Sequence, residues 1–434
     1  METDNKKPLG TEPYKGVRDF YPPDMFVQNY IFDVMRRTVE SYGYVEYSAS
    51  ILESAELYKA KSGEEIVKDQ TYSFMDRGER EVTLRPEMTP TVARMVARNR
   101  QDLSLPLRWY SIPNLFRYEQ PQRGRLREHW QLNVDLFGVA KPEADIEIIS
   151  IASRLMKRFG AKENQFQIQI NNRKIIQALY DYFEFSESES YALSKLIDKK
   201  EKMKRETFVE SIRELVGNKT EDFISILNSV SIDELQSRLP SELQNHTGIE
   251  EIKSVLSGLE KAATTNAVFS PSLMRGFDYY TGIVFEVFDT GPKNRRSLFG
   301  GGRYDDLLDI FGADKITAVG FGMGDVTIRD FLETYNLIPA YRSTTDLYIC
   351  RVEPKLSTEI NLVTEKLRAD GLKVAVDLSS KKVGDQIKTA VKQSIPYIIC
   401  IGGDEIKNGK FKVKELSTGR EEELPLDKVA EHIK

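Results

Sequence analysis

The first strong apolar pattern of the chain follows helical spacing. One face of this segment carries Val27, Ile31, Val34 and Thr38, and Gly43 suits the end of a helix. Two adjacent prolines before these residues suit the first helical turn. The pattern therefore predicts a long helix near the N-terminus, followed by a strand at about residues 45–51.

Between residues 81 and 138 the pattern changes to that of short strands. The clearest strand spans residues 127–137, where apolar side chains alternate with Gln131, Asn133 and Asp135. Successive residues of a strand point to opposite faces of the sheet, so one face of this strand should be core and the other polar.

The chain divides into four consecutive blocks. Residues 1–185 mix helices and short strands, whereas residues 186–260 are charged, helical in pattern and poor in aromatic residues. Strand character returns in residues 261–336, and a linker then leads to residues 344–434. This last block alternates strands and helices, which predicts a mostly parallel sheet covered by helices.

Composition indicates a globular, multidomain protein. With 434 residues, 40% of them hydrophobic and 30% charged, the chain can form two or three packed domains. The N-terminal residues are polar, and no apolar run approaches the roughly 18 residues that a membrane span requires. We therefore expect a cytoplasmic protein. The net charge of -5 disfavours a generic nucleic-acid coat protein, but it is compatible with a local basic groove.

Metal-binding patterns are missing from the sequence. Cys350 and Cys400 each end an apolar, β-branched run, which predicts packing in buried strands. The three histidines are scattered and pair with no cysteine at ligand spacing, which disfavours a structural zinc site. Any metal is therefore expected to arrive with a substrate.

Charged side chains gather in the segment FRYEQPQRGR. Arg117 and Glu119 share a face if FRYEQ is a strand, and the PQRGR loop adds Arg123 and Arg125. A sheet face with charges of both signs is costly to bury unless a ligand or a partner satisfies them. The segment therefore indicates either a ligand pocket or an ordinary solvated face.

Two further segments carry polar groups where predicted strands end. In RPEMT, Glu87 and Thr89 are two residues apart, just before a proline that suits a helix start. In RGFDYY, Arg275 lies close to the adjacent tyrosines Tyr279 and Tyr280. Because neighbours in a strand point to opposite faces, at most one of these tyrosines should line a pocket.

Two glycine-rich runs complete the candidate chemistry. The first, GGG before Arg303 and Tyr304, allows a close approach of backbone to a ligand, although such runs also form tight turns. The second, GFGMGD, lacks the G-x-G-x-x-G spacing of a dinucleotide loop and opens no strand-helix-strand unit. A dinucleotide site is therefore disfavoured.

Taken together, these segments resemble a known family. LRPEMT, FRYEQPQRGRLREHWQLNVDLFG, RGFDYYTGIVFE, GGGRYDDL and AVGFGMG are similar to the motif series of histidyl-tRNA synthetases, in the family's order. GVRDFYP resembles the family's N-terminal signature. FRYEQPQRGR is similar to motif 2, which other class II synthetases share, whereas RGFDYY is the histidine-specific signature. The resemblance covers nearly the whole chain.

The resemblance implies an α+β fold and defined partners. Residues 1–185 and 261–336 would form an antiparallel catalytic sheet flanked by helices, with motifs 1 and 2 in the first part and motif 3 in the second. Residues 186–260 would be a helical insertion that touches the tRNA acceptor arm, and residues 344–434 an α/β anticodon-binding domain. The family further implies a homodimer that uses L-histidine, ATP and histidine tRNA, with no membrane association.

The resemblance also assigns roles to residues. The expected histidine-binding set is Glu87, Thr89, Arg117, Gln131, Asp135, Arg275, Tyr279, Tyr280 and Tyr304. Of these, Glu87, Thr89 and Gln131 would hold the α-amino group, and Asp135 and Tyr280 would meet the imidazole. A carboxylate facing a ring nitrogen fixes the tautomer and rejects amino acids that lack this donor.

The implied chemistry needs no protein nucleophile. The histidine carboxylate attacks the α-phosphate of ATP, and Arg117 and Arg275, with Mg²⁺, would stabilise the phosphoryl charge. Arg117, Glu119 and Arg125 would bind ATP, and Gln122 would contact the acceptor end of the tRNA. No tightly held cofactor is expected.

Some positions depart from the family pattern. In motif 3 the GFGMG run is usually followed by a Glu-Arg pair whose arginine contacts ATP phosphate, but here Val326 and Thr327 follow. Arg329 lies two residues further on, on another face of a helix, so we expect the remaining arginines to hold ATP. Ser50 stands where motif 1 usually has a proline at the dimer interface.

Two alternatives share part of this pattern. The regulatory subunit of ATP phosphoribosyltransferase resembles the catalytic block, but such paralogues usually lack the C-terminal domain and have eroded motifs. A synthetase for proline or threonine would share motif 2 and the tail without explaining RGFDYY. Exchange of pyrophosphate that depends on histidine alone would discriminate among them.

Overall fold

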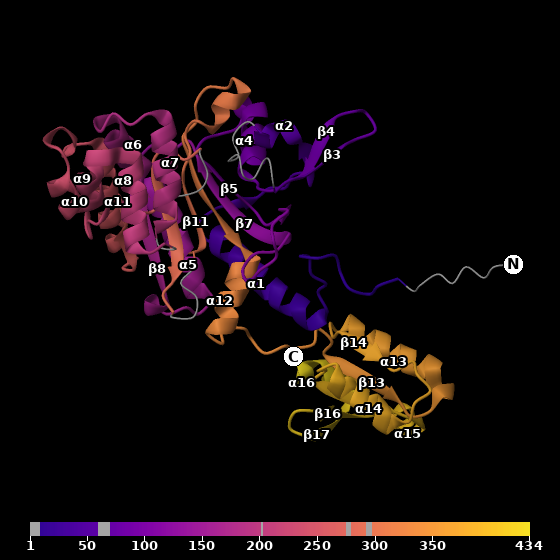
Figure 1. Cartoon of the computed structure of the whole chain (residues 1–434). Helices are drawn as coiled ribbons and strands as arrows, with labels where there is room; N and C mark the ends of the chain where they lie inside the picture. The colour runs from indigo at the N-terminus through magenta and orange to yellow at the C-terminus, as the bar shows by residue number, and fades with distance from the viewer. Residues whose placement is uncertain (1–8, 60–69, 201–202, 275–278, 292–296) are drawn as a thin grey trace. The chain divides into compact units, whose positions relative to one another are not determined.

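The computed structural model describes residues 9–59, 70–200, 203–274, 279–291 and 297–434 (Figure 1). The chain forms two compact units, which are described separately. Unit 1 comprises Met1–Tyr21 and Gln28–Ile338, and unit 2 comprises Pro22–Val27 and Pro339–Lys434. Among the described residues, no helix is long and apolar enough to cross a membrane.

Unit 1 is built on a nine-stranded sheet. Its strands, in spatial order, are β1 (Val45–Glu46), β5 (Leu107–Ser111), β7 (Glu128–Phe137), β12 (Ala318–Gly324), β11 (Ser297–Arg303), β10 (Ile283–Asp289), β8 (Phe166–Asn172) and β9 (Ala267–Phe269), with β6 (Asn114–Phe116) paired to β7. All neighbours are antiparallel except β1 with β5 and β8 with β9. A small sheet of β2 (Leu52–Ser54), β4 (Glu81–Leu84) and β3 (Tyr72–Met75) lies apart from it.

Amphipathic helices cover the large sheet. The predicted N-terminal helix is α1 (Pro22–Glu40), which begins at the two prolines. Helix α5 (Pro142–Arg158) packs against α11 (Thr247–Lys261) and the sheet, and α12 (Asp325–Thr334) packs on β7 and β11. The short helix α2 (Ala55–Lys59) contacts α4 (Thr89–Arg98).

A group of helices lies beside β8 (Figure 1). These are α6 (Arg173–Tyr182), α7 (Glu187–Asp198), α8 (Arg205–Val216), α9 (Thr220–Leu227) and α10 (Ile232–Arg238). Helix α7 begins with a capping box, in which the Ser186 hydroxyl accepts from the Glu189 amide and Glu189 accepts from the Ser186 amide. These helices lie within or next to the predicted insertion, whose limits at 186–260 remain a prediction.

Unit 2 contains a five-stranded sheet in the order β14 (Val374–Val376), β13 (Leu347–Arg351), β15 (Tyr397–Ile401), β16 (Lys410–Glu415) and β17 (Glu421–Pro425). The first three strands are parallel, as predicted, and the last two are antiparallel. The helices of this unit are α13 (Ser357–Ala369), α14 (Val383–Lys392), α15 (Gly403–Asn408) and α16 (Leu426–Ile433). Separate apolar clusters form on the two faces of its sheet.

One strand prediction was wrong in extent. The expected strand at 45–51 is only β1, because the chain leaves the large sheet after Tyr47. The Arg85 guanidinium then donates to the carbonyls of Ala49 and Ser50, at 2.7 and 3.3 Å. A side chain thus satisfies backbone groups that a longer strand would have paired.

Candidate active site

A cavity of about 110 Å³ lies on the polar face of β7. Its wall includes eight residues that the sequence analysis assigned to histidine binding: Glu87, Thr89, Arg117, Gln131, Asp135, Tyr279, Tyr280 and Tyr304. Four separate segments of the chain contribute these side chains. The fold therefore brings together motifs that are nearly 220 residues apart in the sequence.

Asp135 is a deeply buried carboxyl of the cavity wall, at 3% exposure. Its Oδ1 accepts a hydrogen bond from the Tyr304 hydroxyl, whereas its Oδ2 is buried without a hydrogen-bond partner. Burial raises the pKa of Asp135 to about 7, although the Tyr304 hydroxyl acts in the opposite direction. A buried acceptor without a partner suits a ligand that donates an N–H.

A second carboxylate of the cavity wall comes from the segment between β4 and α4. Glu87 is 2% exposed, and its Oε2 accepts from the Tyr279 hydroxyl at 3.2 Å. Thr89 follows as the first residue of α4. The cavity therefore holds two carboxylates from different elements, each contacted by a tyrosine hydroxyl.

The floor of the cavity depends on glycines in β12. Gly320 is in register with Asp135, and Gly322 with Asn133. A Cβ atom at Gly320 would lie 2.6 Å from Asp135 Oδ1, and one at Gly322 would lie 2.2 Å from Gln131 Nε2. Only glycine leaves room for these polar side chains to stand on the sheet.

The two adjacent tyrosines both line the cavity, so the prediction that at most one does was wrong. They precede β10, which begins at Ile283, and strand alternation does not apply to them. Their ring centroids are 4.9 Å apart, with an interplanar angle of 56°.

The FRYEQ segment is also not a strand throughout. Strand β6 ends at Phe116, and the Glu119 amide donates to the Arg117 carbonyl at 2.7 Å. Arg117 lines the cavity and donates through Nε to the Pro86 carbonyl, at 2.9 Å. Glu119 lies outside the cavity wall and pairs with Arg125 Nη1, at 3.3 Å.

The loop after Glu119 is a tight turn. The Gln122 amide donates to the Arg125 carbonyl at 3.0 Å, and the Arg125 amide donates back at 2.9 Å. Arg125 is 59% exposed and Arg123 57%, with Arg123 Nε paired to Asp330 of α12 at 2.7 Å. The turn therefore carries two exposed arginines, and neither they nor Gln122 line the cavity.

Comparison with known proteins identifies the family of this site. The sequence model described as histidyl-tRNA synthetase matches residues 16–326, and the anticodon binding domain model matches residues 346–434. The chain belongs to the histidyl-tRNA synthetase family. The α+β fold prediction, with its antiparallel catalytic sheet and C-terminal α/β domain, is confirmed.

Relatives of this synthetase-family chain match over nearly its full length. It is 42% identical to the histidine–tRNA ligase of Leptospira biflexa serovar Patoc, with 98% of each chain covered. Identity to the histidine–tRNA ligase of Thermoplasma volcanium is 36%, with 96% of each chain covered. In fold, the crystal structure of histidyl-tRNA synthetase from Nostoc sp. PCC 7120 is similar, with a TM-score of 0.82 at 23% identity, covering 98% of this chain and 99% of that one.

Motif 3 of this synthetase carries no arginine at its usual place. Thr327 lies in α12, and its hydroxyl donates to the carbonyl of Leu298 at 2.8 Å. The preceding Asp325 is 1% exposed and accepts from Arg18, Gln28 and the Trp130 amide. Arg329 pairs with Glu333 on α12 at 3.0 Å.

Sequence reasoning omitted part of the cavity wall. Asn133, Gly320, Phe321 and Gly322 also line it. Gly300 lines it as well, and it belongs to the GGG run for which a close approach of backbone to a ligand was one expectation. The polar alternation of β7 pointed to Asn133, and the GFGMG spacing pointed to the glycines once β12 was paired with β7. Arg275, assigned to catalysis and histidine binding, lies outside the described residues.

Proposed function

We propose that this chain activates L-histidine with ATP to histidyl-adenylate and transfers the histidyl group to the 3′ end of histidine tRNA. The observation that carries this function is the Asp135 carboxyl, buried on the polar face of β7 with an Oδ2 that has no hydrogen-bond partner. Membership of the histidyl-tRNA synthetase family supports the same conclusion.

Histidine is held at both ends in this proposal. The cationic α-amino group binds Glu87, Thr89 and Gln131, and the imidazole N–H donates to Asp135, with Tyr280 beside the ring. An amino acid without a ring donor would leave the Asp135 oxygen unpaired, and such buried mismatches discriminate by about 10⁴-fold. Tyr279 and Tyr304 support the two carboxylates through their hydroxyl groups.

The activation step proceeds without a protein nucleophile. An oxygen of the histidine carboxylate attacks the α-phosphorus of ATP, and pyrophosphate leaves. Arg117 and Arg275 stabilise the phosphoryl charge, while Glu119 and Arg125 position the nucleotide. Mg²⁺ enters with ATP and neutralises charge on its phosphates. Because the Thr327 hydroxyl offers no positive charge, the remaining arginines hold ATP.

The other assignments concern the tRNA and the assembly. Gln122 contacts the acceptor end, the helical insertion at 186–260 touches the acceptor arm, and residues 344–434 bind the anticodon, as the match to the anticodon binding domain supports. Residues 1–185 and 261–336 form the catalytic core. We further propose a homodimer that works in the cytoplasm.

The direct test of this function is charging of histidine tRNA with labelled histidine by the purified protein. We expect charging that needs ATP and Mg²⁺ and is lost in Asp135→Ala.

A solved structure from Bacillus halodurans is also similar in fold, with a TM-score of 0.76 at 26% identity, covering 91% of this chain and 99% of that one. It is described as an ATP phosphoribosyltransferase regulatory subunit/histidyl-tRNA synthetase. Folded protein that neither activates histidine nor charges tRNA would favour a regulatory role.

A further inference from the structure

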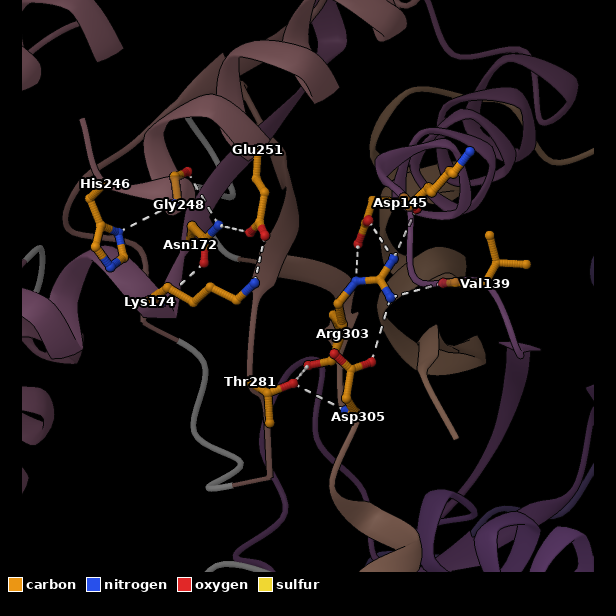
Figure 2. A network of polar contacts seen from close by, with 11 residues as sticks. Val139, Asp145, Asn172, Lys174, His246, Gly248, Glu251, Thr281, Arg303 and Asp305 are labelled. Carbon is orange, nitrogen blue, oxygen red and sulfur yellow. Dashed lines mark hydrogen bonds and ion pairs between the residues drawn. The ribbon is translucent and has the colours of Figure 1, made fainter. Parts of the chain in front are cut away.

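A buried ion pair joins Arg303 to Asp145 (Figure 2). Arg303 Nη2 is 2.6 Å from Asp145 Oδ2, and the side chains are only 5% and 3% exposed. The guanidinium also donates to the carbonyls of Val139 and Lys141, at 3.0 and 3.3 Å. Arg303 thereby ties the end of β11 to the first turn of α5, where Asp145 lies.

The same network reaches the segment that carries the adjacent tyrosines (Figure 2). The Thr281 amide donates to the Arg303 carbonyl at 2.8 Å, and the Thr281 hydroxyl accepts from the Asp305 amide at 3.1 Å. The Asp305 carboxylate accepts from the Ala318 amide at 3.1 Å, at the start of β12. Thr281 follows Tyr280, and Arg303 and Asp305 flank Tyr304.

We propose that Arg303, Asp145 and Thr281 are positioning residues for histidine binding, an inference that rests on the proposed function. None of the three lines the cavity. They fix the backbone on which the Tyr280 and Tyr304 rings stand, and Tyr304 in turn orients Asp135. The residues assigned to ATP among the described ones, from Arg117 to Arg125, belong to a different segment. Loss of the network therefore acts on histidine rather than on ATP.

Thr281 is the best position for a test. Arg303→Ala would leave the Asp145 carboxylate buried without its partner and destabilise the fold. Thr281→Val keeps the shape and removes the hydroxyl, which accepts from the Asp305 amide and donates to the Arg303 carbonyl at 3.4 Å. Thr281→Ser restores both contacts. We expect Thr281→Val to raise the KM for histidine about tenfold in pyrophosphate exchange, with the KM for ATP within about twofold, and Thr281→Ser to behave as wild type.

Each outcome of this test decides a different claim. A lower melting temperature of Thr281→Val with an unchanged KM for histidine would overturn the positioning role, as would an equal rise in both KM values. Absence of histidine-dependent exchange in the wild-type protein would instead overturn the proposed function itself.

An independent observation concerns unit 2. The two cysteines of the chain, Cys350 on β13 and Cys400 on β15, are direct register partners on adjacent parallel strands. Both contact the apolar cluster around Ala390, Ile395 and Ile398, so they share a face of the sheet. Cys350 is buried and Cys400 is half-buried. Contact between the thiols lowers the pKa of Cys400 and raises that of Cys350.

We infer that Cys350 and Cys400 form a thiol–disulfide exchange site for small-molecule disulfides. Adjacent strands lie about 4.8 Å apart, which falls within the Cα separations that disulfides span. The Cys400 thiolate attacks the reagent disulfide and releases one thiol. Cys350 then loses its proton and attacks Cys400 Sγ, displacing the second thiol. Two protein thiols are thereby oxidised, and one reagent disulfide is reduced to two thiols.

Glutathione disulfide, added to the full-length protein, tests this site. We expect loss of both thiols and an intact mass lower by two hydrogen atoms, with reversal by dithiothreitol. Cys350→Ala should accumulate one glutathione on Cys400, because the resolving thiol is absent, and Cys400→Ala should remain unmodified. A wild-type protein that keeps both thiols, or that stops at the mixed disulfide, would overturn the inference.

Discussion

Asp135 combines burial with a nearly neutral pKa. Burial raises the pKa of its carboxyl from the ordinary value of 3.8, which applies to the unfolded chain, to about 7 in the folded protein. Between these values the folded protein holds a proton that the unfolded chain has released, so the free energy of unfolding falls as pH rises. The total effect in the ligand-free protein reaches up to about 4 kcal/mol.

Asp135→Asn tests this linkage, because an amide does not titrate. We expect the melting temperature of the wild-type protein to fall more steeply than that of the variant as pH rises from about 4 to about 7. Burial also raises the pKa of Asp145, to about 6, but this residue is present in both proteins and cancels in the comparison. Parallel pH profiles would contradict the raised pKa of Asp135.

The arginines of the motif 2 turn are expected to replace the missing motif 3 arginine. Arg125 is exposed and pairs with Glu119 of the same turn, whereas Arg329 pairs with Glu333 along α12. We therefore predict that Arg125→Ala raises the KM for ATP about tenfold, the loss expected for a charge-assisted hydrogen bond. Arg329→Ala serves as the matched control and should leave this KM unchanged. A raised KM for ATP in Arg329→Ala, with an unchanged KM in Arg125→Ala, would show instead that Arg329 binds ATP.

Individual residues could be placed from the sequence where motifs were specific. Eight of the residues assigned to histidine binding line one cavity, although their binding roles remain proposals. Pattern reasoning without motifs was weaker. It predicted that at most one of Tyr279 and Tyr280 lines the cavity, because it assumed a strand where the chain is irregular.

At the scale of elements, β12 matters because glycines occupy its positions next to the polar side chains of β7. A methyl group at Gly322 would meet the Gln131 amide, which can move, so Gly322→Ala should fold with a displaced Gln131. We predict a loss of about 100-fold in kcat/KM for histidine, as expected for misplacement by about 1 Å. Gly384→Ala, where a methyl group meets no atom within 4 Å, is the matched control and should retain activity.

If a methyl group at position 322 displaces only the Gln131 side chain, the backbone fold of Gly322→Ala should be unchanged. Gly322→Ala should keep a far-UV circular dichroism spectrum like that of wild type, since the displaced group is a side chain. Gly301→Ala should not, because its Cβ atom would lie 1.9 Å from the Gly320 carbonyl oxygen. Normal histidine kinetics in Gly322→Ala would contradict the account.

Elements were predictable where a long pattern repeated. Alternation over ten residues indicated β7, and helical spacing with two prolines indicated α1. The strand expected at 45–51 failed because Arg85, which is distant in the sequence, binds the Ala49 and Ser50 carbonyls. FRYEQ failed because its last residues form a turn. The Arg85 contact is tertiary and has no local signal in the sequence.

At the scale of the whole molecule, an acidic chain is expected to bind an acidic partner. Its net charge is -5, so tRNA binding requires a local basic surface, which we place at the Arg123 and Arg125 turn. The affinity for histidine tRNA should therefore fall linearly on a log–log plot against salt concentration, through counterion release. Fluorescence anisotropy with labelled tRNA measures this slope. A slope near zero would contradict the proposal that this basic surface binds tRNA.

Exchange of pyrophosphate into ATP, measured with each standard amino acid in turn, tests the central claim most directly. The account predicts exchange with histidine alone, because only its ring donor pairs with Asp135. Exchange with another amino acid, or no exchange in protein shown to be folded, would contradict it.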